Sequence, residues 1–140
     1  MRLPLLIAAA FCLAACDGEP QPPLIASDIV IIAALPGQAV SAGYISLTNN
    51  TDVAISISRV VSPDFAAIEI HATLLEDGIA KMRRIDELSI PAHSTVALQS
   101  GGKHLMLMQP RGTTGQASLA FFDGDTLLLS VTVPLTTRND

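Results

Sequence analysis

Imidazole and thioether side chains gather in one stretch of this 140-residue sequence. The histidines His71 and His104, and all the methionines beyond the initiator, Met82, Met106 and Met108, lie between residues 71 and 108, as does the third histidine, His93. Methionines that only fill a core would be scattered along the chain. Thioether sulfur and imidazole nitrogen suit Cu(I), whereas calcium and magnesium prefer carboxylate and carbonyl oxygens. The stretch therefore indicates a site for a soft monovalent copper ion.

The strand that carries His71 has a period of two. Ile68 and Ile70 fall on one face of an expected strand over residues 67–75, and Glu69, His71 and Thr73 fall on the other. Because the isoleucines belong in the core, His71 is expected to project outward.

Met82 follows the next turn, Asp77-Gly78. If that hairpin has an even loop, Thr73 opposes Met82, and His71 and Met82 become diagonal neighbours roughly 7 to 8 Å apart at Cα. A three-residue loop would change the parity. Two long side chains at this separation can share one ion.

A second alternating run follows later in the chain, with the order His104-Leu105-Met106-Leu107-Met108. If the two leucines face the core, the histidine and both methionines face outward, where an apolar side chain needs a reason. Metal binding at the surface supplies one. Substitution of His104 or Met106 is therefore expected to leave the fold intact.

The N-terminus reads as a targeting segment. Arg2 precedes an apolar run over residues 3–13, too short to span a bilayer stably. Leu13-Ala14-Ala15-Cys16 then resembles the lipobox of bacterial lipoproteins, in which the cysteine thiol takes up a diacylglycerol. An ordinary signal peptide cut at an Ala-x-Ala site is the alternative. We expect a signal peptide over residues 1–15, lipidation at Cys16, and a periplasmic protein anchored to a membrane by its N-terminal lipid.

Cysteine use limits the chemistry of the rest of the chain. The two cysteines are Cys12, removed with the signal peptide, and Cys16, consumed by lipid. No disulfide and no thiolate metal site is then expected in the folded domain. Neutral methionine and histidine ligands also suit an oxidising compartment better than thiolates do.

Length and charge narrow the class of protein. The chain supports one domain, expected over residues 24–140 after a stiff, polar, proline-rich tether over residues 16–23. The formal net charge is −5, so nucleic acid is not an expected partner, because phosphate binding needs a basic surface.

Alternation at period two, broken by turn residues about every ten positions, predicts an all-β sandwich or barrel and no helix. Pro36-Gly37, Asp77-Gly78 and Asp123-Gly124 are among the turn signals. The expected strands cover residues 29–34, 42–48, 53–61, 67–75, 79–85, 94–98, 104–108, 117–122 and 126–133.

These residues resemble the periplasmic copper chaperones called PCuAC. That family carries His, ten residues, Met, twenty-one residues, His, one residue and Met, and His71, Met82, His104 and Met106 have this spacing. The surrounding sequence is similar as well, from Ala42-Gly43-Tyr44 to the Gly101-Gly102 pair before His104, and the likeness covers residues 24–135.

The resemblance implies a cupredoxin-like Greek-key β-barrel that binds Cu(I) at an exposed site through these four side chains. It also implies delivery of copper toward cytochrome c oxidase, either to its CuA centre or through an assembly factor. Family members often have a C-terminal tail with His and Met that holds a second ion, but this chain ends Thr136-Thr137-Arg138-Asn139-Asp140, so one site is expected. The segment Gln109 to Gly115 also looks shorter than in the family.

Other candidate residues have simpler interpretations. Met108 shares the parity of Met106 but lies outside the ligand pattern, and we expect it to pack beside the site. His93 is expected to be solvated in a turn. A basic cluster near the ligands is either ordinary soluble surface or a docking site for a partner; its members are Lys81, Arg83, Arg84 and Lys103.

Two other classes of protein remain as alternatives. One is a structural or interaction β-barrel lipoprotein whose methionines and histidines are incidental. The other is an enzyme, but a blue-copper centre needs a cysteine ligand, and the sequence has no serine nucleophile elbow and no His-Glu metalloprotease motif. We therefore expect a protein without enzymatic activity.

Overall fold

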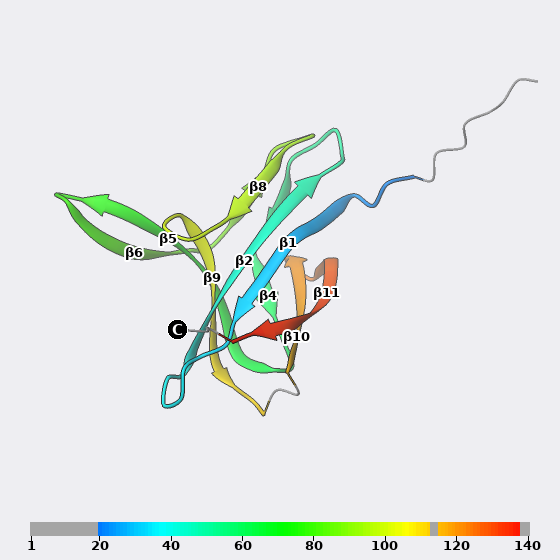
Figure 1. Ribbon diagram of the computed structural model, residues 1–140. Coiled ribbons are helices and arrows are strands. Elements are labelled where there is room, and N and C mark those ends of the chain that lie inside the picture. Colours follow the sequence, from blue (N-terminus) through cyan, green and yellow to red (C-terminus); the bar gives the residue numbers. More distant parts are fainter. Residues whose placement is uncertain (1–19, 113–114, 138–140) are drawn as a thin grey trace, which may run out of the picture.

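Every regular element in the described part of the chain is a β-strand. A computed structural model describes residues 20–112 and 115–137 (Figure 1). The prediction of an all-β fold is therefore confirmed. The strands are β1 (Leu24–Ile32), β2 (Val40–Asn49), β3 (Ile55–Ile57), β4 (Arg59–Val61), β5 (Phe65–Glu76), β6 (Ile79–Ile85), β7 (Leu88–Ile90), β8 (Thr95–Leu98), β9 (Lys103–Pro110), β10 (Gln116–Asp123) and β11 (Thr126–Thr136).

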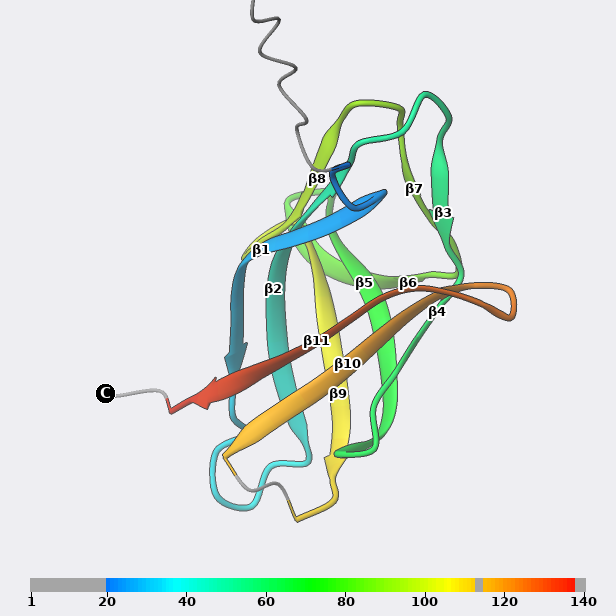
Figure 2. The same cartoon turned by 90° about the vertical axis from the view of Figure 1, so that its right-hand side faces the viewer.

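Most of these strands join one mixed sheet with the order β4-β10-β11-β1-β2-β9-β5-β6, in which β8 also pairs with β2. The pairs are antiparallel except for β1 with β11, which run parallel. Figure 2 shows β10 and β11 crossing in front of β2, β9 and β5, so the sheet folds over on itself. A separate small sheet pairs β3 with β7.

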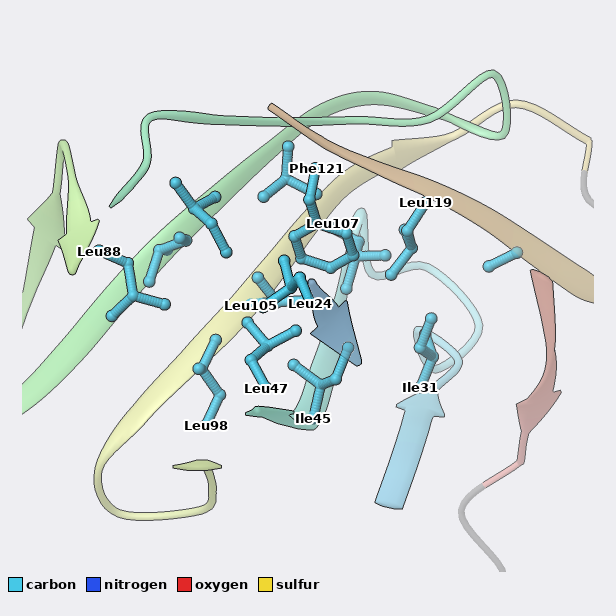
Figure 3. Packing of buried hydrophobic residues seen from close by; sticks show 14 of the residues in the cluster. Leu24, Ile31, Ile45, Leu47, Leu88, Leu98, Leu105, Leu107, Leu119 and Phe121 are labelled. Atoms are coloured by element: carbon cyan, nitrogen blue, oxygen red, sulfur yellow. The ribbon is translucent and has the colours of Figure 1, made fainter. Parts of the chain in front are cut away.

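The core lies between these two layers. Leu105 and Leu107 of β9 lie among Ile45 of β2 and Leu119 and Phe121 of β10 (Figure 3). All five side chains are almost completely buried. Burial of large aliphatic and aromatic side chains is the main favourable contribution to folding, so β9 is held firmly through its leucine face.

Gly43 of β2 allows the leucines of β9 to pack closely. A Cβ atom built on Gly43 would lie 3.1 Å from Cβ of Leu105 and 3.1 Å from Cδ1 of Leu107. A side chain here would force the leucines to shift, and with them the strand that carries His104 and Met106. The glycine therefore contributes to the position of the candidate ligands.

Two expected strands differ from the structure for local reasons. The segment expected as one strand over residues 53–61 is two strands, because the chain changes partners at Ser58, from β7 to β10. The backbone N–H of Ser58 donates to the carbonyl of Phe122 at 2.9 Å, and its Oγ accepts a hydrogen bond from the N–H of Gly124 at 2.8 Å. The three-residue strand β7 was not predicted.

The first strand begins earlier than expected. The alternation of apolar residues is interrupted at Ser27-Asp28, which placed the expected start at residue 29, but β1 begins at Leu24. The register of β1 against β2 shifts between Ser27 and Val30, and Asp28 has φ = 50°. This bulge explains the interruption, because it adds residues without ending the strand.

Asn49 at the end of β2 is a fully buried polar residue, with an exposed fraction of 0%. Its Nδ2 donates to the carbonyls of Val53 at 2.8 Å and Ile90 at 3.0 Å, and its Oδ1 accepts from the backbone N–H of Thr51 at 2.8 Å. The amide therefore joins β2, the turn that follows it and β7.

Replacing Asn49 with alanine should lower the free energy of unfolding by about 2–4 kcal/mol, because several buried backbone groups lose their partners. Urea denaturation measures the change. Asn50→Ala is the matched control, since the side chain of Asn50 donates an exposed hydrogen bond to the carbonyl of Pro22 at 2.9 Å, and its loss should change stability by about 0.5 kcal/mol or less. Equal losses in the two variants would contradict this role of Asn49.

Candidate metal site

Strands β5 and β9 bring the two histidines together. They pair antiparallel with His71 opposite His104 and Glu69 opposite Met106. The alternate pairs on these strands include Ile70 with Leu105, both buried in the core. His71, His104 and Met106 therefore lie on the outer face of the same sheet, as their parity predicted.

Met82 joins this face from the neighbouring strand. The β5–β6 hairpin closes with the even loop that the parity argument required, and Thr73 lies opposite Met82. That prediction is confirmed, and His71 and Met82 are diagonal neighbours. The hairpin extends away from the rest of the sheet (Figure 1), and Met82 is 61% exposed.

Three of the four candidate ligands line one hollow with a volume of about 300 Å³. His71 is not part of its lining, but the centroid of its ring is 6.2 Å from that of His104. The lining residues are Val40, Ser41, Ala42, Tyr44, Thr73, Met82, Ser100, Gly101, His104 and Met106.

His104 is more enclosed than its parity suggested. The sequence placed it outside the core at the surface, but only 9% of the residue is exposed. It does point away from the leucine core, but it is set below the surface, in a hollow that Tyr44 of β2 and the turn before β9 also line. Substitution of His104 would therefore remove a buried side chain, so a cost in stability is expected where strand parity alone predicted none.

Hydrogen bonds define which nitrogen of each ring is free. Nδ1 of His104 donates to the carbonyl of Gly102 at 3.1 Å, which leaves the lone pair on Nε2. Nε2 of His71 donates to Oε2 of Glu69 at 2.8 Å, which leaves the lone pair on Nδ1. Nδ1 of His71 is buried and has no hydrogen-bond partner. Buried polar atoms are nearly always partnered, so this atom fits a position for a metal ion.

Glu69 is a functional candidate that sequence reasoning missed. Strand parity placed Glu69 only on the same strand face as His71. Its Oε1 accepts from Nη1 of Arg84 at 3.0 Å while Oε2 accepts from His71. The hydrogen bond from His71 and the charge of Arg84 hold the pKa of Glu69 below its ordinary value, although partial desolvation raises it. The i, i+2 spacing of Glu69 and His71 on one strand is the signal that could have found it.

The basic cluster is largely paired with carboxylates. Lys81 and Arg83 bind Glu76 on the opposite face of the hairpin, at 2.9 Å and 2.7 Å, and these hydrogen bonds lower the pKa of Glu76. Arg84 binds Glu69. The surface near the hollow is therefore less positive than the sequence suggests.

The remaining candidates lie elsewhere. Met108 shares the face of Met106 and pairs with Ala67 and Val40, but it does not line the hollow. His93 is exposed, as expected, with its Nε2 2.7 Å from Oδ1 of Asp52.

Within residues 20–112 and 115–137, no group of three or more His, Cys, Asp and Glu side chains could hold a metal ion. In the same residues, no helix is long and apolar enough to cross a membrane. The expected signal peptide, Cys16 and the first part of the tether lie outside the described residues, as does part of the segment Gln109 to Gly115.

The fold and this face define a cupredoxin-like domain of the PCuAC type. The copper-bound PCuAC domain from PmoF2 superposes with a TM-score of 0.64 at 19% identity, over 84% of this chain and 94% of that one. The Cu(I) form of DR1885 from Deinococcus radiodurans superposes with a TM-score of 0.60 at 26% identity, over 89% of this chain and 83% of that one. The predicted cupredoxin-like Greek-key fold is confirmed.

The chain belongs to the LpqE-like family of putative lipoproteins, which residues 24–134 match. The uncharacterised protein RP573 of Rickettsia prowazekii is 28% identical over 99 residues, which cover 66% of this chain and 55% of that protein. The chain thus spans about half the length of this curated relative.

The lowered pKa of Glu76 makes stability depend on pH. A carboxyl whose pKa is lower in the folded state stabilises the fold above its ordinary pKa of 4.5 and loses this contribution as pH falls through the folded value. The melting temperature of Glu76→Gln should therefore decrease less than that of the parent when the pH is lowered from about 6 to about 3. Thermal unfolding followed by circular dichroism measures this, and identical losses in the two proteins would contradict it.

Proposed function

We propose that this protein is a periplasmic copper(I) chaperone that binds one Cu(I) through His71, Met82, His104 and Met106. The observation that carries the proposal is the buried, unpartnered Nδ1 of His71, next to a hollow that the other three side chains line. Two imidazole nitrogens and two thioether sulfurs form a donor set that suits Cu(I). The copper-bound forms of similarly folded proteins, PmoF2 and DR1885, support the same proposal.

The burial of the ligands suits a carrier that must release its metal. His104 is 9% exposed and Met82 is 61% exposed, so the ligand set extends from the interior to the surface. A ligand of an acceptor protein can reach the ion from the Met82 side and replace that thioether first. Copper is therefore the cargo of this protein, and we propose that the protein does not act as an enzyme.

We propose that the protein delivers its copper toward cytochrome c oxidase, either to a subunit of the oxidase or to its assembly factor. We propose that a lipid on Cys16 anchors the protein, and membership in a family of putative lipoproteins supports this anchor. A tether beside membrane-bound acceptors would raise the effective concentration of the carrier there.

Titration of the full-length protein in mild detergent with Cu(I), against a competing chelator, tests the proposed site. The parent should bind one Cu(I), and the double variant His71→Ala with Met106→Ala should lose at least about 100-fold in affinity, because two of four donors are gone. Bound Cu(I) should also raise the melting temperature of the parent.

His93→Ala is the control for this titration, because His93 is an exposed histidine outside the hollow. It should bind copper like the parent. The absence of stoichiometric binding by the parent would instead support a structural β-barrel without a metal function. A marked loss in His93→Ala would place the site elsewhere.

Met82→Ala should increase the rate at which the loaded protein loses Cu(I) to the chelator by about tenfold, because the ligand that closes the solvent side is missing. Stopped-flow absorbance of the chelator complex measures this rate. Leu75→Ala is the matched control, since Leu75 is a 77% exposed apolar residue on the same face of the same hairpin. If both variants release copper equally fast, the rate depends on the exposed apolar surface of the hairpin in general, and Met82 is not a ligand.

A further inference from the structure

Beyond the four candidate ligands, the geometry points to Glu69 as a positioning residue that fixes the ring orientation and the tautomer of His71. This inference rests on the proposed function, in which His71 binds Cu(I). Glu69 itself is not a candidate ligand. It lines a separate, smaller hollow of about 70 Å³ and is not part of the lining that Met82, His104 and Met106 share.

The hydrogen bond between Glu69 and His71 assigns the two ring nitrogens different roles. A carboxylate only accepts hydrogen bonds, so the 2.8 Å contact with Oε2 of Glu69 requires a proton on Nε2 of His71. A neutral imidazole then has its lone pair on Nδ1, the buried atom without a partner. Without the carboxylate, either nitrogen could carry the proton and the ring could turn over about its χ2 bond.

Arg84 of β6 holds the carboxylate in place. Its Nη1 lies 3.0 Å from Oε1 of Glu69, and its Nε lies 3.2 Å from Oδ1 of Asp86. Arg84 is also the register partner of His71 across the β5–β6 pair. Each oxygen of Glu69 therefore has its own donor, and the Glu69 side chain is restrained from two strands.

A support of this kind affects metal affinity by preorganisation. Metal-binding histidines usually donate their second N–H to a carboxylate or a carbonyl, and loss of that partner typically costs about 10–100-fold in affinity. His104 has such a partner in the Gly102 carbonyl. Glu69 gives His71 the equivalent support, but through a side chain, so it can be removed by mutation.

The test compares Glu69→Ala, Glu69→Gln and Glu76→Ala in the full-length protein. Glu76→Ala is the matched control, because Glu76 lies on the same strand and also binds basic residues of β6 but contacts no histidine. Chelator competition measures Cu(I) affinity. The ¹⁵N chemical shifts of the His71 ring in the copper-free protein report its tautomer, which the loss of an ordinary surface ion pair would not change.

Glu69→Ala should bind Cu(I) about 10–100-fold more weakly than the parent and should show a mixture of His71 tautomers. Glu69→Gln, which keeps an oxygen acceptor, should lie closer to the parent and remains informative if the alanine variant folds poorly. Glu76→Ala should change neither measurement. An unchanged His71 tautomer in Glu69→Ala would overturn the inference. If the parent itself binds no copper, the proposed function fails, but the ring shifts of the copper-free variants still decide the role of Glu69.

Discussion

The antiparallel pairing of β5 with β9 determines where every candidate ligand lies. Ile70 opposes Leu105 and both are buried, so the residues between them on each strand, His71 and His104, face the other way. A slip of one residue would turn the imidazoles into the core and the leucines into water. The apolar core therefore fixes the register. The same register places the polar residues on the other face of the two strands, although these residues are not needed to stabilise the pairing.

The candidate ligands on this face differ in exposure, which is consistent with the reversible copper binding that we propose. His104 is almost buried, in a hollow that Tyr44 and the turn before β9 also line. Met82 lies on a hairpin that extends beyond the sheet (Figure 1), and the hairpin is held across its other face by the ion pairs of Glu76. Exposed pairs of this kind are weak, so the backbone pairing of β5 with β6 contributes more than these ion pairs to holding Met82 in place.

Local patterns predicted the orientation of the ligands but not their neighbours. Alternation in residues 67–75 gave the face of His71, and the two-residue turn Asp77-Gly78 gave the pairing of Thr73 with Met82. The pairing of β5 with β9 and the parallel pairing of β1 with β11 join distant segments, and no periodicity within either segment encodes its partner. The hollow around His104 is lined by residues of other segments, including Tyr44 of β2, so strand parity alone could not predict the burial of His104.

The unpartnered Nδ1 of His71 helps to decide whether the polar residues on this face serve metal binding or only the stability of the fold. A buried acceptor without a partner costs about 1–3 kcal/mol, and a face evolved for stability alone would avoid this cost by turning the ring. The hydrogen bond to Glu69, itself held by Arg84, keeps the ring from turning. The fold therefore maintains an unpartnered lone pair on the face that also carries Met82 and Met106, at a cost in stability. An ion that accepts that lone pair would remove the cost, so the unpartnered nitrogen supports the proposed metal site.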